Sequence, residues 1–190
     1  MSVKDNRKKN VDRMKDHYSD QEIKDQIDRY SLVKNDKPEK ISVIYIDDEE
    51  DALKSFKALY RFDFNIFITS SVTEAEEIID NNDIHVIIID QRMPEITGVE
   101  FLSKIIKKHP EPIRILLTGY SDINSVIAAI NQGKIFRYMS KPYLMEDMKQ
   151  IIEIAAETYF LRKDKEQLLK AFARCNSQLE FMFRQKMLDI

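Results

Sequence analysis

Short apolar runs alternate five times with longer amphipathic stretches along the middle of this 190-residue chain. No other feature constrains the fold as strongly, because strands that alternate with helices build βαβ units and a parallel sheet covered by helices on both faces. The apolar runs are ISVIYID (41–47), FNIFITS (64–70), IHVIIID (84–90), IRILLTG (113–119) and IFRYMSK (135–141). Helical patterns follow at Glu49–Tyr60, Thr73–Asn82, Gly98–His109 and Ser121–Gln132, with another from near Leu144. The predicted fold class is therefore α/β, with an open, doubly wound sheet of five parallel strands.

Polar side chains stand where four of these five strands end. Asp47 and Asp48 follow the first strand, Asp90 the third, Thr118 the fourth and Lys141 the fifth. An open parallel sheet binds its ligands at the carboxyl ends of its strands, and in the order 2-1-3-4-5 the first and third strands are neighbours. A single aspartate at a strand end is an ordinary turn or helix-capping residue. The prediction of a site therefore rests on all four strand ends together.

The three carboxylates repel one another unless a cation lies between them. Mg²⁺ prefers oxygen ligands and usually keeps water or phosphate in its coordination shell, so Asp47, Asp48 and Asp90 are predicted to form a magnesium site. Lys141 can pair with a phosphoryl oxygen or a carboxylate, and Thr118 offers a hydroxyl donor. With Asp90 as the nucleophile, the group could accept a phosphoryl group as an acyl phosphate.

The two flanks differ from the middle of the chain. Residues 1–40 are highly charged, and the capping-box pattern at Ser19–Glu22 predicts a helix at about 20–33. From Tyr143 to Ile190 there is no Gly or Pro. We expect three segments: a charged helical extension (1–40), a core (41–143) and a long C-terminal helix (144–190).

Apolar residues recur along the C-terminal segment at spacings of three and four. They are Ile151, Ile154, Leu161, Leu168, Phe172, Cys175, Leu179 and Met182. This heptad-like spacing favours a coiled coil that forms a homodimer over a helical hairpin folded back on its own core.

Composition excludes several classes of protein. Residues 41–159 carry twelve Lys or Arg against twenty Asp or Glu, which argues against direct nucleic-acid binding by the core. The single cysteine, Cys175, excludes a disulfide framework within one chain and suits a reducing, cytoplasmic setting. No apolar run is long enough to predict a transmembrane helix, so no membrane insertion is expected. No glycine-rich phosphate loop occurs, which argues against a nucleotide-binding version of this fold.

Residues 41–157, about 60% of the chain, resemble a response-regulator receiver domain of two-component signalling, whose fold is flavodoxin-like with strand order 2-1-3-4-5. The resemblance is specific because the order, spacing and strand context of its motifs agree together. The matching residues are Asp47-Asp48, Asp90 in IIIDQRMPEITG, Thr118 in LLTGYSD, Tyr138 in FRYMSKP, and Lys141-Pro142.

The resemblance implies a role for each of these positions. Asp90 is expected to be phosphorylated by a sensor histidine kinase or phosphotransfer protein. Mg²⁺ is expected on Asp48, Asp90 and the backbone carbonyl of Arg92, with Asp47 acting through water. Thr118 and Tyr138 match the switch pair, and the peptide before Pro142 is expected to be cis.

The function that we expect is a phosphorylation-dependent switch that signals through the fourth helix, the fifth strand and the C-terminal helix. The signal would be altered dimerisation or altered binding of an unidentified downstream protein. No separate catalytic output domain is expected, so the enzymatic activity would be limited to phosphoryl acceptance and autodephosphorylation at Asp90. Two alternatives stay open: a helical scaffold with a vestigial receiver, or a fragment of a longer regulator.

Overall fold

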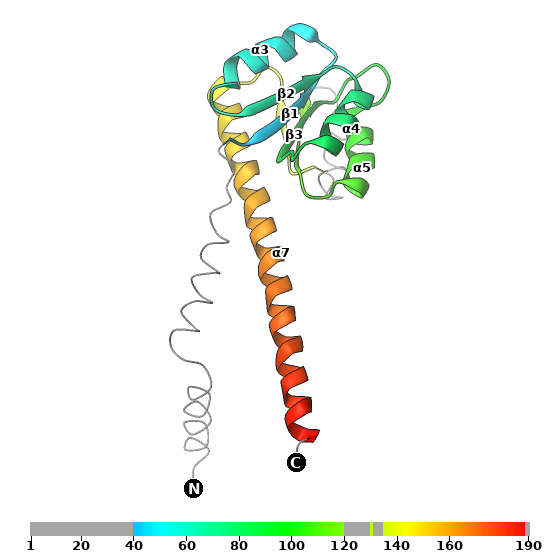
Figure 1. Ribbon diagram of the computed structural model, residues 1–190. Coiled ribbons are helices and arrows are strands. Elements are labelled where there is room, and N and C mark those ends of the chain that lie inside the picture. Colours follow the sequence, from blue (N-terminus) through cyan, green and yellow to red (C-terminus); the bar gives the residue numbers. More distant parts are fainter. Residues whose placement is uncertain (1–39, 120–129, 131–134, 189–190) are drawn as a thin grey trace. The chain divides into compact units, whose positions relative to one another are not determined.

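A computed structural model of the chain describes residues 40–119, residue 130 and residues 135–188. Within them the elements are β1 (Ser42–Ile46), α3 (Glu50–Tyr60), β2 (Asn65–Thr69), α4 (Val72–Asn81), β3 (Val86–Asp90), α5 (Gly98–Lys108), β4 (Ile113–Thr118), β5 (Arg137–Ser140) and α7 (Met145–Leu188) (Figure 1). The helix predicted at 20–33 and nearly all of the one predicted at 121–132 lie outside the described residues.

The strands form one parallel five-stranded sheet in the order β2-β1-β3-β4-β5, which confirms the predicted fold. β3 lies at the centre, and all five of its residues are buried. A central parallel strand has helices over both of its faces, so no position along it faces water. This explains why the run 86–90 shows no alternation of polar and apolar residues.

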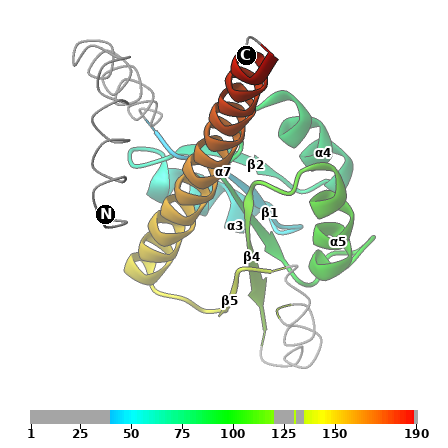
Figure 2. The same ribbon diagram turned by 90° about the horizontal axis from the view of Figure 1, so that it is seen from below.

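Two apolar cores lie on opposite faces of the sheet, because successive side chains of a strand point to opposite sides. Val43 and Tyr45 of β1 belong to one core, whereas Ile44 and Ile46 belong to the other. Helices α3 and α7 cover the first face, and α4 and α5 cover the second (Figure 2).

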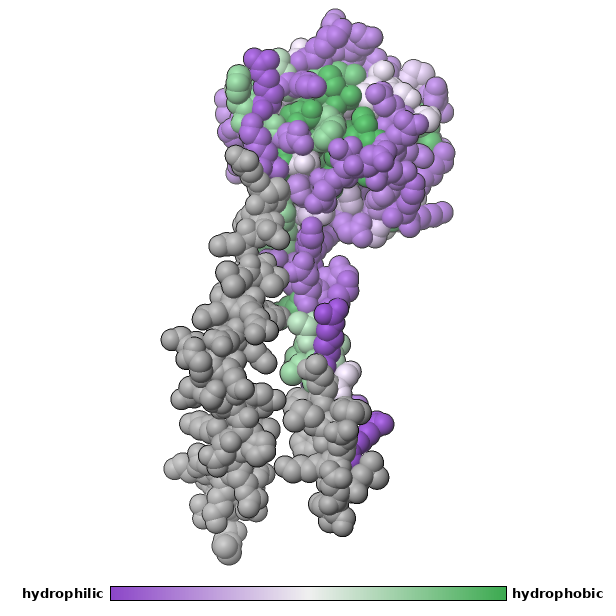
Figure 3. Space-filling view, viewed as in Figure 1, coloured by the Kyte–Doolittle hydropathy of each residue, from purple (hydrophilic) through white to green (hydrophobic). Residues whose placement is uncertain are grey.

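Helix α7 is 44 residues long, which confirms the predicted long C-terminal helix. Its first turns pack on the sheet through a buried stripe formed by Met148, Ile152, Ala155, Ala156 and Tyr159. Beyond this stripe Leu161, Leu168, Leu169 and Phe172 are exposed, and Figure 3 shows hydrophobic surface on the part of α7 that projects from the sheet. The sequence analysis did not predict this stripe. Two of its members, Ala155 and Ala156, are small residues that were not counted when large apolar side chains were used to find a seam.

The Asp83 carboxylate and the His85 ring contact two aromatic residues of α7, Tyr159 and Phe160, where the helix leaves the sheet. The hydroxyl of Tyr159 donates to Asp83 Oδ1 at 3.1 Å. The ring of His85 lies 4.9 Å from that of Tyr159 and 5.1 Å from that of Phe160, measured between centroids. Burial lowers the pKa of His85, so the neutral ring accepts a hydrogen bond from the Ser42 amide at Nδ1. These contacts fix the direction in which the exposed part of α7 projects.

No helix within the described ranges is both long enough and apolar enough to cross a membrane.

The turn that follows β3 is held tightly against the sheet. The amide of Gln91 donates to the Leu117 carbonyl at 2.8 Å, and the amide of Gly98 donates to the Gln91 carbonyl at 3.1 Å. Helix α5 then begins with a reciprocal capping box between Thr97 and Glu100. Gly98 lies so close to β3 that a Cβ atom there would overlap the Asp90 carbonyl oxygen and approach Leu116 Cδ1 to 2.8 Å. The close approach of this backbone to Asp90 requires a glycine.

We expect Gly98→Ala to destabilise the fold by about 1–3 kcal/mol, the usual cost of overpacking a core. Gly119→Ala is the matched control, since a Cβ atom at position 119 would meet nothing within 4 Å. Urea unfolding of both variants measures the difference. Equal stability of the two variants would contradict the proposed close packing at Gly98.

Candidate functional site

Four strand ends place polar side chains at one edge of the sheet. Asp90 ends β3 and Thr118 ends β4, while Asp47 directly follows β1 and Lys141 directly follows β5. Because Ile46 pairs with Ile89 in the register of β1 and β3, Asp47 and Asp90 are neighbours across the sheet. The structure thus brings together the two buried aspartates that the sequence singled out.

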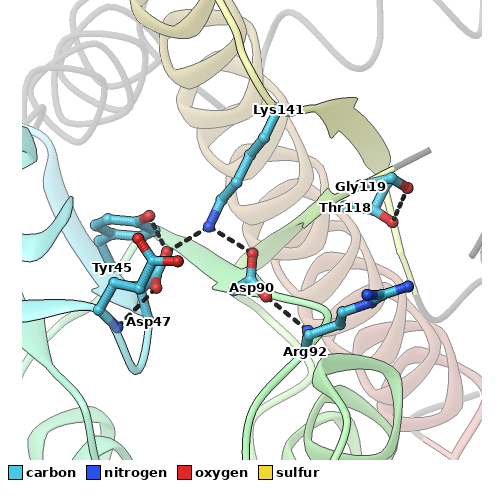
Figure 4. Close-up of polar contacts among 8 residues, drawn as sticks. Tyr45, Asp47, Asp90, Arg92, Thr118, Gly119 and Lys141 are labelled. Carbon is cyan, nitrogen blue, oxygen red and sulfur yellow. Dashed lines mark hydrogen bonds and ion pairs between the residues drawn. The ribbon is translucent and has the colours of Figure 1, made fainter. Parts of the chain in front are cut away.

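Lys141 joins the two aspartates. Its Nζ lies 2.7 Å from Asp47 Oδ2 and 2.6 Å from Asp90 Oδ1 (Figure 4). Asp47 is fully buried and Asp90 is 7% exposed, so each carboxylate needs a charged or hydrogen-bonding partner. Burial opposes the charge on Lys141, but the hydrogen bonds and charges of the two aspartates outweigh it and raise the pKa of the lysine. Lys141 is therefore a cation held between two buried anions.

Backbone amides and a phenol satisfy the remaining lone pairs of these carboxylates. The Arg92 amide donates to Asp90 Oδ2 at 2.6 Å, and the Glu49 amide donates to Asp47 Oδ1 at 3.0 Å. The hydroxyl of Tyr45 donates to Asp47 Oδ2, the same oxygen that Lys141 contacts. Burial, followed by the Asp47 hydrogen bond, raises the pKa of Tyr45, which keeps the phenol protonated.

The sequence analysis missed Tyr45 as a part of the site. The signal was available, because side chains two residues apart on a strand point to the same face and Tyr45 precedes Asp47 by two. It was overlooked because an aromatic residue in a strand is usually explained by packing alone. Here the ring does pack in the core, while its hydroxyl reaches the carboxylate.

Within the described residues, the structure brings two of the three predicted carboxylates, Asp47 and Asp90, together through Lys141, and the magnesium site itself stays a prediction. Asp48 is exposed, and among those residues no three His, Cys, Asp or Glu side chains are grouped so as to hold a metal ion. The donor set nevertheless fits Mg²⁺, since Asp47 and Asp90 bring carboxylate oxygens together where the protein itself places a cation.

Thr118 and Tyr138 lie on the neighbouring strands β4 and β5. The Thr118 side chain is buried and its hydroxyl donates to the Gly119 carbonyl at 3.0 Å. Tyr138 is 43% exposed, so its ring points away from the core. The peptide between Lys141 and Pro142 is cis, as predicted. The roles of Thr118 and Tyr138 as a switch pair, and that of Arg92 as a carbonyl ligand, stay predictions.

Comparison with known proteins identifies similar sequences and folds. A family model described as the response regulator receiver domain matches residues 43–153. The hydrogenase transcriptional regulatory protein HoxA of Cupriavidus necator is 32% identical over 127 residues, which are 67% of this chain and 26% of that protein. HoxA of Bradyrhizobium diazoefficiens is 30% identical over 66% of this chain and 26% of its own length. This chain thus spans about a quarter of the length of these curated relatives.

Solved structures resemble the same region. A structure described as an adenylate cyclase from Rhodopirellula baltica is 33% identical with a TM-score of 0.67, and the match covers 69% of this chain and 98% of that one. A response regulator receiver domain protein from Clostridium thermocellum is also 33% identical, with a TM-score of 0.60 over 64% of this chain and 98% of its own.

We expect Lys141→Ala to destabilise the fold by about 3 kcal/mol, because two buried carboxylates lose their shared cation. Added Mg²⁺ should recover part of this loss, since a cation that binds the folded state stabilises it. Denaturant unfolding with and without Mg²⁺ measures both effects.

Lys149→Ala serves as the control, because Lys149 forms a 2.5 Å ion pair with Asp63 in which both side chains are about 40% exposed. Exposed pairs contribute little, so this variant should unfold like the wild type, whether or not Mg²⁺ is present. Indistinguishable behaviour of the two variants would contradict the proposed role of Lys141.

Proposed function

The chain belongs to the response regulator receiver family, and we propose that it acts as a phosphorylation-dependent switch whose phosphoryl acceptor is Asp90. The observation that carries the proposal is the bridge from Lys141 to both Asp47 and Asp90 at the carboxyl edge of the sheet. Asp90 is 7% exposed, which shields it from bulk water yet leaves it within reach of a donor from outside.

Phosphoryl transfer at this site replaces one bond by another. A carboxylate oxygen of Asp90 attacks the phosphorus of a phosphohistidine on a kinase or phosphotransfer protein. The new P–O bond forms as the P–N bond breaks, and the imidazole leaves with the electron pair and takes up a proton. The Arg92 amide, which donates to Asp90 Oδ2, fixes the orientation of the attacking carboxylate.

Positive charge at the site supports this transfer, because charge spreads over the phosphoryl oxygens in the transition state. Asp48, Asp90 and the carbonyl of Arg92 would hold Mg²⁺, with Asp47 acting through water. When bound, the ion supplies charge that offsets the phosphoryl oxygens. Lys141 stands beside Asp90 and can exchange its contact with the carboxylate for one with a phosphoryl oxygen.

The switch itself would pass from Thr118 to Tyr138. A phosphoryl group on Asp90 gives the Thr118 hydroxyl a stronger acceptor than the Gly119 carbonyl that it now contacts. Movement of Thr118 opens space beside β5, and the exposed ring of Tyr138 turns inward. Such a change shifts the balance between two existing conformations.

The output would be association of two copies through α7. Leu161, Leu168 and Phe172 are each more than half exposed, and Leu161 and Leu168 lie one heptad apart on a helix that continues beyond the sheet. An apolar seam of this kind is buried when two helices form a coiled coil. The seam therefore supports a homodimer whose packing responds to Asp90.

The curated relatives favour a second candidate output. Both HoxA proteins are named as transcriptional regulatory proteins, and the match covers about a quarter of each. The same receiver switch could therefore control a transcriptional effector rather than a coiled coil alone.

Asp90→Asn should abolish phosphoryl labelling of the chain by acetyl phosphate in the presence of Mg²⁺, because an amide is not a nucleophile at this site. Intact-protein mass spectrometry measures the added phosphoryl group. Asp80→Asn is the control. Asp80 is a partly exposed carboxylate that lies away from the site and pairs with Lys108 and His109. Retained labelling of Asp90→Asn would refute Asp90 as the acceptor.

Leu168→Glu should reduce self-association of the full chain by at least tenfold, because it places a charge within the proposed apolar seam. Sedimentation equilibrium gives the dissociation constants. Ser177→Glu is the control, because it adds the same single negative charge at an exposed position of α7 that lies outside the seam. If both variants associate like the wild type, α7 is not the dimer interface.

A further inference from the structure

Three aromatic side chains form a continuous row beside the site. The ring centroids of Tyr45 and Phe56 are 4.4 Å apart, and those of Phe56 and Tyr60 are 4.7 Å apart. Each of the three residues is at most 2% exposed. Rings at these distances are in direct contact within a close-packed core, so one cannot move without displacing the next.

Hydrogen bonds attach both ends of this row to functional elements. At one end the Tyr45 hydroxyl donates to Asp47. At the other end the Tyr60 hydroxyl donates to the carbonyl of Met145, the first residue of α7, at 3.0 Å. Burial raises the pKa of Tyr60 to about 12, so its hydroxyl is also protonated and donating at neutral pH.

The backbone between Lys141 and Met145 provides a second connection between Asp47 and the start of α7, beside the aromatic row. Lys141 binds Asp47, and only residues 142–144 separate Lys141 from Met145. The start of α7 is consequently connected to Asp47 along two routes, one through the backbone after Lys141 and one through Tyr60, Phe56 and Tyr45.

We propose that Tyr45 is a positioning residue for Asp47, and that the row Tyr45–Phe56–Tyr60 transmits occupancy of the Asp90 site to the first turn of α7. This inference rests on the proposed function, since it needs a phosphoryl group or its analogue at Asp90. It adds a route to α7 that does not involve Thr118 or Tyr138.

The movement along the aromatic row would be driven by competition between Tyr45 and Lys141 for the Oδ2 atom of Asp47. Tyr45 and Lys141 both donate to Asp47 Oδ2. When Lys141 turns toward a phosphoryl oxygen at Asp90, Oδ2 loses one donor and the phenol of Tyr45 becomes its main partner. The loss of the lysine contact changes the balance of partners at Oδ2 and repositions the Tyr45 ring, and the packed rings carry the shift to Tyr60 and Met145. Coupling of this kind needs a change in free energy at both ends of the row, and the hydrogen bonds to Asp47 and to the Met145 carbonyl are the contacts at which we expect that change.

The test uses the full chain with Mg²⁺ and beryllofluoride, a phosphoryl analogue. Backbone hydrogen exchange in the first turn of α7, 145–148, reports the response, and titration reports the Mg²⁺ affinity. In the wild type, beryllofluoride should change the exchange rates of this turn. In Tyr60→Phe, the affinities for Mg²⁺ and beryllofluoride should stay within twofold of wild type, while the exchange response falls by at least half.

Tyr45→Phe should weaken Mg²⁺ binding by about tenfold, the usual effect of removing a hydrogen bond that orients a ligand, and it should also reduce the response of α7. Tyr159→Phe is the matched control: it removes a buried hydroxyl from α7 itself, bonded to Asp83, and should keep both the affinity and the response.

Two failures can be told apart. If the wild type binds no beryllofluoride, the proposed function fails and the inference falls with it. If the wild type binds it but α7 does not respond, or if α7 responds as strongly in Tyr45→Phe and Tyr60→Phe as in the wild type, the aromatic route alone is overturned. Thermal unfolding of each variant verifies that the comparison is made between folded proteins.

Discussion

The bridge from Lys141 to Asp47 and Asp90 is the interaction on which the rest of the structure depends. Two carboxylates buried at adjacent strand ends are stable only with a cation between them, and Lys141 supplies it from the far side of β4. The position of Lys141 also limits where α7 can begin, because the first residue of that helix, Met145, follows only four residues later. In the proposed mechanism, a phosphoryl group on Asp90 takes over the contact that Lys141 now makes with the Asp90 carboxylate.

Burial on both faces makes the sheet rigid, while helix α7 is only partly buried. The first turns of α7 share the core of β1, β3 and β4, whereas its later turns expose Leu161, Leu168 and Phe172. This division suits a switch: the rigid part preserves the geometry of Asp90, and the exposed part can change its partners. The contacts of Asp83 and His85 mark the boundary between the two parts.

The sequence predicted the five strands and their ends because these follow from local patterns, whereas the sheet order came from the resemblance to receiver domains. Apolar runs of strand length, such as 86–90, alternate with helical periodicity, and the elements observed begin and end within about two residues of those expected. The predicted meeting of Asp47, Asp90 and Lys141 follows from topology alone. What local pattern could not predict is how side chains share partners. The exposure of Asp48, the bond of Tyr45 to Asp47 and the small-residue stripe at Ala155 and Ala156 depend on three-dimensional packing.

If charge at Asp90 controls the behaviour of α7, as we propose, the molar mass of the full chain tests it most directly. Multi-angle light scattering measures this mass with Mg²⁺ present and beryllofluoride added or omitted. We expect beryllofluoride to change the average mass at a fixed protein concentration, and the change to disappear when Asp90 is replaced by Asn. An unchanged mass in a sample that demonstrably binds beryllofluoride would contradict the coupling between Asp90 and α7.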